Sequence, residues 1–204
     1  LRTPLTSIKG YISMVIDGDA GATTEMQKKF LSEAFSSSER MVHIVSDLLN
    51  VSRLQTGKFV LDKTTGNLGI IVAKDSEILS ASAESRVLKL ELEIADNIPD
   101  SYADFDKLRQ VIMNMVDNAI YYSKPNTKIT VSVAKIGNKL EFGVDDNGIG
   151  VPKAEQAGLF GKFYRAGNAR QQRPDGTGVG LYLAKKVVLS HKGNVIYKSK
   201  ASGS

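Results

Sequence analysis

A seven-residue repeat of apolar side chains in the first quarter of the chain constrains its fold more than any other feature. The repeat and its neighbours form a stripe of Leu31, Ala34, Phe35, Met41, Val42, Val45, Leu48 and Leu49. This spacing is typical of one long helix that packs along a seam. Thr-Thr-Glu at 23–25 supplies a cap and Thr-Gly-Lys at 56–58 ends the pattern, so we predict a helix to about Gln55.

A shorter helix is predicted before it. Its apolar positions are Leu5, Ile8, Ile12 and Val15. Steps of three and four residues are typical of a helix with a narrow packing seam. Two antiparallel helices of this kind cannot cover their apolar faces alone, so we expect two chains to form a four-helix bundle. The open alternative is that the hairpin, residues 1–57, packs against the rest of its own chain.

Residues 58–204 predict a second domain of mixed helix and strand. Helices are expected over 67–85, 105–122 and from about 177 to 191, and strands over 88–94, 128–134, 139–145 and 194–198. Alternating side chains around Gly137 and Asn138 indicate a β-hairpin. The glycine-rich segment 147–177 is too long for a simple connector, so we predict a mobile functional loop.

Composition excludes several kinds of site. The chain has no cysteine, which removes disulfides and thiolate metal ligands and fits a reducing, cytoplasmic compartment. Its net charge of +5 comes from scattered basic residues, so we predict a solvated basic surface and no nucleic-acid partner. No apolar run approaches the roughly twenty residues that span a bilayer. The chain opens on Leu1 without methionine, and we expect it to be cut from a longer protein.

Two asparagines are the first candidate ligands. Asn114 and Asn118 lie one turn apart at the edge of the apolar stripe of the helix over 105–122. An asparagine oxygen is an uncharged ligand suited to Mg²⁺, which keeps several waters and bridges phosphate oxygens. The alternative is that both side chains hydrogen-bond to neighbouring loops.

A carboxylate and two glycines follow the strand over 139–145. In the sequence Asp-Asn-Gly-Ile-Gly at 146–150, Asp146 offers an acceptor, and Gly148 and Gly150 allow the backbone to approach a ligand closely. An adenine amino group would satisfy that acceptor. An ordinary glycine turn after a strand is the alternative interpretation.

A second glycine-rich loop, Gly-Thr-Gly-Val-Gly-Leu at 176–181, opens a helix. The free N–H groups and the dipole of a helix N-terminus favour an anion such as phosphate. The loop is neither the dinucleotide fingerprint nor a P-loop. Between the two loops, Phe160 and Phe163 precede Arg165, a cation able to neutralise a terminal phosphate. The alternative there is a small apolar cluster with a solvated arginine.

Taken together, the asparagine pair, DNGIG, FGKFYR and GTGVGL occur in the order and spacing of the histidine-kinase catalytic domain. Residues 1–5, Leu-Arg-Thr-Pro-Leu, also look like the end of the phosphoacceptor motif His-Glu-Leu-Arg-Thr-Pro-Leu. The chain therefore resembles the sensor histidine kinases over its whole length. The resemblance implies an α+β chain, with a dimerisation and phosphotransfer hairpin over 1–57 and an α/β sandwich of the gyrase-like ATPase type over 58–204.

The resemblance implies that ATP and Mg²⁺ lie between the asparagine helix and a lid over about 147–177. Asn118 matches the Mg²⁺ ligand, Asn114 a phosphate or metal-water contact, and Asp146 the adenine acceptor. Arg165 matches the lid cation at the γ-phosphate. The other residues expected at the nucleotide are Tyr122, Gly148, Gly150, Phe160, Phe163, Gly176, Gly178, Gly180 and Leu181.

Two departures from the family pattern stand out. Tyr121 occupies a position where the family commonly has lysine or arginine, so a phosphate contact there requires Lys124 or a lid cation. The phosphoacceptor histidine and the acidic residue after it are expected two and one positions before Leu1. His43 and His191 match no part of the motif, and we predict structural roles for both.

The implied activity is transfer of the γ-phosphoryl group of ATP to a histidine of the dimer, and then to an aspartate of a response regulator receiver domain. Thr3 resembles the threonine that orients water for dephosphorylating the regulator, a helix N-terminal contact being the alternative. Membrane attachment would come only from segments before Leu1. A catalytically silent ATP-binding scaffold that docks a regulator remains a second hypothesis, with Tyr121 as its sequence hint. A different ATPase of the gyrase-like fold is a third, which the hairpin disfavours.

Overall fold

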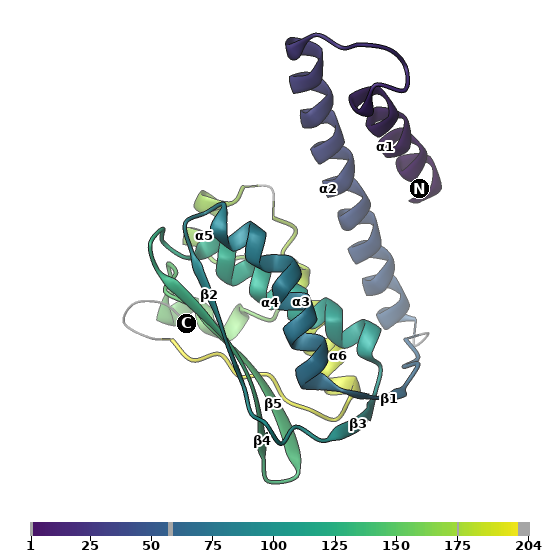
Figure 1. Ribbon diagram of the computed structural model, residues 1–204. Helices are drawn as coiled ribbons and strands as arrows, with labels where there is room; N and C mark the ends of the chain where they lie inside the picture. The colour runs from purple at the N-terminus through teal and green to yellow at the C-terminus, as the bar shows by residue number, and fades with distance from the viewer. Residues whose placement is uncertain (1, 57–58, 175, 200–204) are drawn as a thin grey trace. The chain divides into compact units, whose positions relative to one another are not determined.

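The computed structural model describes residues 2–56, 59–174 and 176–199, and it divides into two units at residues 59 and 60. The boundary expected at 57 and 58 lies outside the described residues. Figure 1 shows a helical hairpin followed by a unit in which helices cover a sheet. The predicted fold class, a helical hairpin followed by an α/β sandwich, is confirmed.

The hairpin consists of α1 (Arg2–Asp17) and α2 (Glu25–Gln55), as predicted. Thr24 caps α2: its hydroxyl accepts from the Gln27 N–H at 3.3 Å, and the Gln27 side chain accepts from the Thr24 N–H at 2.9 Å. This reciprocal pair satisfies two N–H groups that the first turn leaves unpaired. Across the hairpin, Lys9 contacts Glu39 at 2.5 Å and lies 5.0 Å from the ring centre of Phe35.

The second unit contains two sheets. Strand β2 (Lys89–Ile94) pairs in parallel with β4 (Lys128–Ile136), which pairs antiparallel with β5 (Lys139–Asp145). A separate antiparallel pair joins β1 (Thr64–Asn67) to β3 (Asp100–Ala103). The β4–β5 turn uses Gly137 at φ 61°, a conformation that glycine adopts at little cost.

The helices that lie beside the larger sheet are α3 (Leu68–Glu84), α4 (Phe105–Tyr122) and α6 (Gly180–Ser190). Figure 1 shows α3 and α4 side by side over it, and α6 packs against α4. The buried core between these layers comprises Leu68, Val72, Leu79, Ala83, Leu88, Ile98, Ile112, Val116, Ala119, Ile120, Ile129, Val131 and Val133. Because α4 turns its apolar stripe into this core, its polar edge is left at the side of the sandwich.

The start of α4 is fixed by Asp104, whose carboxylate is almost fully buried. One oxygen accepts from the Lys107 N–H at 3.0 Å and the other from the Asp62 N–H at 2.9 Å. Burial alone would raise the pKa of Asp104, but these two backbone donors lower the pKa below its usual value. His191 accepts from the Asp104 N–H at 3.0 Å and bonds the Val187 carbonyl through its other nitrogen, in keeping with the structural role predicted for it.

Three sequence predictions differ from the structure. Strands β1 and β3 were not expected; they are short and polar, and each depends on a partner distant in sequence. The segment 147–177 contains η1 (Lys153–Gly158) and α5 (Gly167–Gln172), so it is not wholly irregular. The strand predicted over 194–198 is wrong: its side chains alternate in burial, but within the described residues it joins no ladder, and alternation alone does not supply a pairing partner.

Candidate functional site

The asparagine edge of α4 faces the N-terminus of α6. A Cβ placed on Gly180 would lie 3.3 Å from Asn114 Oδ1. The predicted asparagine and the second glycine loop, 66 positions apart in the sequence, therefore lie together. A side chain at 180 would press on the carboxamide, so the glycine keeps open a polar surface that combines an amide oxygen with helix N–H groups.

The polar side chains on this edge of α4 suit a Mg²⁺ ion that takes ligands from both the protein and a phosphate group. Among the described residues, no group of three histidine, cysteine or acidic side chains could hold an ion by itself. Asn118 lies one turn after Asn114, on the same edge of α4, and is half-buried. A Mg²⁺ ion here would take its remaining ligands from phosphate oxygens and water, which is the coordination this ion prefers.

The DNGIG turn lies against the C-terminal end of α4. Asp146 accepts from the Gly148 N–H at 2.7 Å, and Gly148 bridges to Ser123, the residue that follows α4. A Cβ on Gly148 would lie 2.8 Å from both the Asp146 carboxylate and the Tyr122 carbonyl, so only glycine fits. A carboxylate has acceptor capacity beyond one such bond, which suits recognition of an exocyclic amine. Tyr122 and Asp146 are thus neighbours at one end of the site.

The lid is organised around a half-buried polar pair, Glu155 and Tyr164. Glu155 accepts from the Tyr164 hydroxyl at 3.2 Å and from the Gly167 N–H at 2.8 Å. Burial, followed by the bond to Glu155, raises the pKa of Tyr164. A Cβ on Gly158 would reach the Tyr164 ring at 2.8 Å, so η1 packs closely on that ring. Contacts within the lid therefore hold η1 and the start of α5 to the Tyr164 side chain.

Arg165 joins the lid to the second glycine loop. Its guanidinium donates to the carbonyls of Ala169 and Pro174 at 3.1 and 3.0 Å, and also to that of Arg173. A Cβ on Gly176 would lie 3.0 Å from the Cζ atom of Arg165. The predicted cation therefore lies directly against the loop predicted to hold phosphate.

Backbone strain accompanies this contact. Gly178 has φ 67° and packs against the backbone of Phe163, itself a non-glycine residue at φ 60°. The Phe163 side chain is 53% exposed, whereas Phe160 is half-buried with the Lys185 ammonium 5.5 Å from its ring centre. Leu181 lies half-buried in the first turn of α6. In this arrangement Phe163 contributes its backbone to the loop, and its ring lies at the surface.

The side chains of Thr3, a candidate at the regulator, and of His43, for which a structural role is predicted, lie outside the described part of the chain, although both positions belong to helices.

The structure adds a cluster that the sequence does not reveal. Arg86 and Arg173 both lie against the Tyr121 ring, and Arg173 also pairs with Asp117 at 3.3 Å. Tyr121 stands out in the sequence only as a departure from the family pattern. Its partners are 35 and 52 positions away, and no spacing rule connects them.

Family models match both parts of the chain. The model described as "His Kinase A (phospho-acceptor) domain" matches residues 1–57. The model described as "Histidine kinase-, DNA gyrase B-, and HSP90-like ATPase" matches residues 103–204, half of the chain, and indicates ATP binding. The second match covers α4, both glycine loops and the lid.

Full-length relatives are similar over nearly all of the chain. The circadian input-output histidine kinase CikA of Synechococcus elongatus is 31% identical over 98% of this chain. The sensor protein kinase WalK of Staphylococcus saprophyticus is 32% identical over 96%. The chain spans only 27% and 32% of the lengths of these two proteins.

Solved structures show the same fold. Full-length ShkA, in complex with AMPPNP, superimposes with a TM-score of 0.75 at 22% identity and covers 93% of this chain and 38% of its own. The Acinetobacter baumannii histidine kinase AdeS gives a TM-score of 0.68 at 24% identity and covers 99% of this chain and 91% of its own.

Proposed function

Because this chain belongs to the histidine kinase family, we propose that it is the kinase core of a two-component sensor, which binds MgATP and transfers the γ-phosphoryl group to a histidine. The observation that carries the proposal is the contact between Asn114 and Gly180. It brings an uncharged oxygen ligand and a phosphate-binding helix terminus to one place, as phosphoryl transfer by positioning and charge neutralisation requires.

At the metal end, Asn118 is the proposed Mg²⁺ ligand, and Asn114 contacts a phosphate oxygen or a metal-bound water. When bound, the ion neutralises charge on the phosphates. The proposal is supported by the place of Asn118, which is half-buried one turn after Asn114 on the edge of α4 that meets the start of α6. An ion held by one amide oxygen depends on the nucleotide for the rest of its shell.

At the other end, Asp146 accepts a hydrogen bond from the adenine amine while Tyr122 packs beside the base. The glycine at 148 supports this assignment, since a larger residue would collide with both neighbours. Gly178 and Gly180 present backbone N–H groups to the phosphates, Gly176 gives the loop its close approach to Arg165, and Arg165 supplies positive charge from the lid.

The hairpin would supply the dimer and the phosphoacceptor. Its large apolar residues, including Ile8, Phe30 and Leu48, are 47–61% exposed, which supports burial against a second hairpin. We propose that the phosphoacceptor histidine lies two positions before Leu1 and that Thr3 helps to dephosphorylate a regulator. No described helix has the length and apolar character needed to cross a bilayer. We propose that this core works in the cytoplasm and passes phosphate to a receiver-domain aspartate.

Nucleotide binding tests the proposal. Asn118→Ala and Asp146→Ala should each weaken binding of a fluorescent ATP analogue, with Mg²⁺ present, by roughly ten- to a hundredfold. A hydrogen bond to a charged group contributes about 1.5–3 kcal/mol, and 1.4 kcal/mol is tenfold in affinity. Asn138→Ala, in the exposed β4–β5 turn, and Asp96→Ala, at an exposed loop position, are matched controls. Equal affinities in all four variants would refute the nucleotide site.

The second candidate is a scaffold that binds ATP without phosphorylating histidine. It is favoured by Tyr121, which cannot make the phosphate contact of a basic residue. The two candidates separate in a protein that carries the histidine ahead of Leu1. Acid-labile phosphohistidine formed with MgATP supports the kinase, and tight nucleotide binding without it supports the scaffold.

A further inference from the structure

Tyr121, at the end of α4, lies beside two arginines from different parts of the second unit. The guanidinium carbon of Arg86 lies 4.7 Å from its ring centre and that of Arg173 lies 4.5 Å from it. Both distances are within the range of cation–π attraction. Arg86 follows α3 in the body of the domain, whereas Arg173 ends α5 in the lid. The ring therefore connects a fixed element to a lid element.

Hydrogen bonds reinforce the connection. The Tyr121 hydroxyl donates to the Gln172 carbonyl at 3.3 Å, and the Gln172 side chain donates to the Tyr121 carbonyl at 3.3 Å. Arg86 donates to the same carbonyl at 3.1 Å. Carbonyls in the last turn of a helix lack intrahelical partners. The donors from Arg86 and Gln172 therefore pair the Tyr121 carbonyl of α4, and the two bonds with Gln172 also hold α5 in place.

Arg173 extends the connection to the phosphate loop. Its guanidinium pairs with Asp117 at 3.3 Å, and Asp117 and Tyr121 flank Asn118 along α4. Its carbonyl accepts from the Arg165 guanidinium and from the Gly176 N–H at 3.3 Å. One residue thus ties α4 to both the lid cation and the first glycine of the loop.

We propose that Tyr121 is a positioning residue that latches the lid onto α4 by drawing Arg173 to its ring. The electron-rich face of a tyrosine attracts the two guanidinium groups, whereas a lysine at 121 would repel both of them. Tyrosine therefore does more than remove a cation from this end of α4, because its ring holds a cation of the lid next to Asp117. The latch is made by contacts within the chain, but its effect on nucleotide retention rests on the proposed function.

Amide hydrogen exchange in the nucleotide-free chain tests the latch directly. The amides of Arg170 and of Arg173, the residue after α5, donate to the carbonyls of Ala166 and Ala169 and report the opening of this helix. Tyr121→Lys and Tyr121→Ala should accelerate their exchange by roughly tenfold, because local opening no longer has to break the contact of Arg173 with the ring. Tyr121→Phe keeps the ring and should retain most of the protection.

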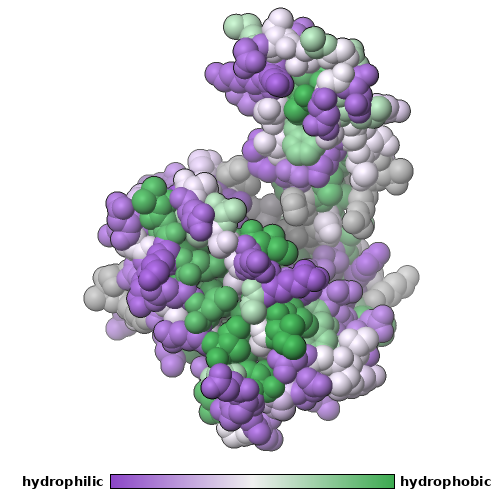
Figure 2. Space-filling model, viewed as in Figure 1, coloured by the Kyte–Doolittle hydropathy of each residue, from purple (hydrophilic) through white to green (hydrophobic). Residues whose placement is uncertain are grey.

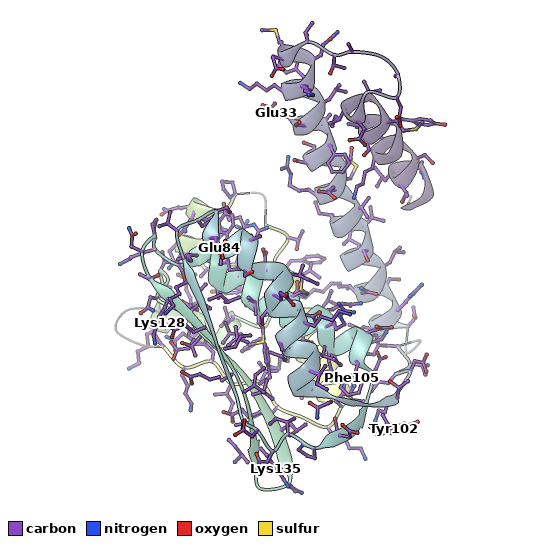
Figure 3. All side chains as sticks on the ribbon, viewed as in Figure 1. Glu33, Glu84, Tyr102, Phe105, Lys128 and Lys135 are labelled. Carbon is purple, nitrogen blue, oxygen red and sulfur yellow. The ribbon has the colours of Figure 1, made fainter. Side chains whose placement is uncertain are left out.

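The matched control is Tyr102→Lys. Tyr102 is 70% exposed on β3, at the end of the domain remote from α5 (Figures 1 and 3). The same change of charge there should leave exchange of α5 unaltered. Asp117→Ala removes the ion pair but keeps the Tyr121 ring and the Arg173 guanidinium, so it should accelerate exchange less than Tyr121→Ala does. If Asp117→Ala accelerates exchange and Tyr121→Ala does not, the lid contact belongs to the ion pair and the role of the ring is overturned.

Nucleotide kinetics give the second readout. Tyr121→Lys should release a bound fluorescent ATP analogue roughly tenfold faster than the unaltered chain, in proportion to the loss of lid protection. If the lysine instead tightens nucleotide binding with exchange unchanged, it contacts phosphate directly and no latch exists. If exchange responds as expected but the unaltered chain binds no nucleotide, the latch stands and the proposed function fails.

Discussion

The hairpin and the nucleotide domain both contain helices with a periodic apolar face, but the two regions differ in how far that face is buried. Of the buried apolar residues in the part of the chain that the structure describes, all but Val51 belong to the second unit. Apolar side chains also reach the surface of that unit (Figure 2), and Ile70 on α3 is 70% exposed. Exposure alone therefore does not separate the two regions. What separates them is that, among the described residues, only the nucleotide domain buries an extended core within one chain, so we expect the hairpin to need an additional surface.

The largest effect expected from this difference is at Ile112, which is 2% exposed at the centre of the core. Ile112→Ala should lower the free energy of unfolding of the nucleotide domain by about 3 kcal/mol, because it removes buried methyl groups and leaves a cavity. Ile8→Ala makes the same change in the hairpin, where the side chain is 47% exposed. At concentrations that keep the chain monomeric it should cost less than about 1 kcal/mol.

Denaturant unfolding of each unit measures both losses, and their dependence on concentration sharpens the comparison. If two hairpins form a bundle, the cost of Ile8→Ala should grow as the chain becomes dimeric, whereas that of Ile112→Ala should not. Equal costs at low concentration would mean that the hairpin already has a complete core in one chain.

The sequence predicted best the elements whose signals are local. Helix α4 has the bounds that were predicted for it, because an apolar stripe of helical spacing runs along it. Strands β1 and β3 escaped prediction because pairing makes them strands, and pairing across 33 or more positions leaves no periodic signal. The strand predicted over 194–198 is wrong for a related reason, since these residues pair with no other strand among the described residues.

For the candidate site too, local motifs could be predicted from the sequence, whereas contacts between distant residues could not. The asparagines and the glycine loops are contiguous motifs, so they could be named before any geometry was known. The contact of Asn114 with Gly180, and the one between Tyr121 and Arg173, arise only when α4, α6 and the lid fold together. A motif specifies which chemical groups are present, and tertiary packing decides which of them meet.

A smaller effect on stability is expected from the N-cap residues of the two regions. The cap of α4, Asp104, is charged, whereas the cap of α2, Thr24, is neutral. Two backbone donors lower the pKa of Asp104, so its carboxylate stabilises the folded domain above its unfolded pKa and loses that contribution as the pH falls below about 4. Asp104→Asn should cost about 1 kcal/mol at pH 7 and flatten the acid side of the stability profile. Thr24, the cap of α2, does not ionise, so Thr24→Ala should cost a similar amount at all pH values.

Urea unfolding of the nucleotide domain between pH 3 and pH 7 provides the measurement. An Asp104→Asn domain whose stability still falls as steeply as that of the unaltered domain would place the acid sensitivity in other carboxylates.

The smallest effect concerns the ion pair of Lys9 and Glu39, whose side chains are 37% and 43% exposed. An exposed pair of this kind contributes about 0.5 kcal/mol, so Lys9→Met should barely change the unfolding of the monomeric hairpin. Lys128→Met, which removes an exposed partner of Glu91, provides the reference in the other unit.

The two variants should diverge only if a second hairpin covers Lys9. A paired charge that loses water becomes costly to break, and the methionine would then weaken the dimer severalfold in sedimentation equilibrium. If Lys9→Met leaves dimerisation unchanged, the partner covers a different face of the hairpin, and the exposed apolar residues beside Lys9 remain in water.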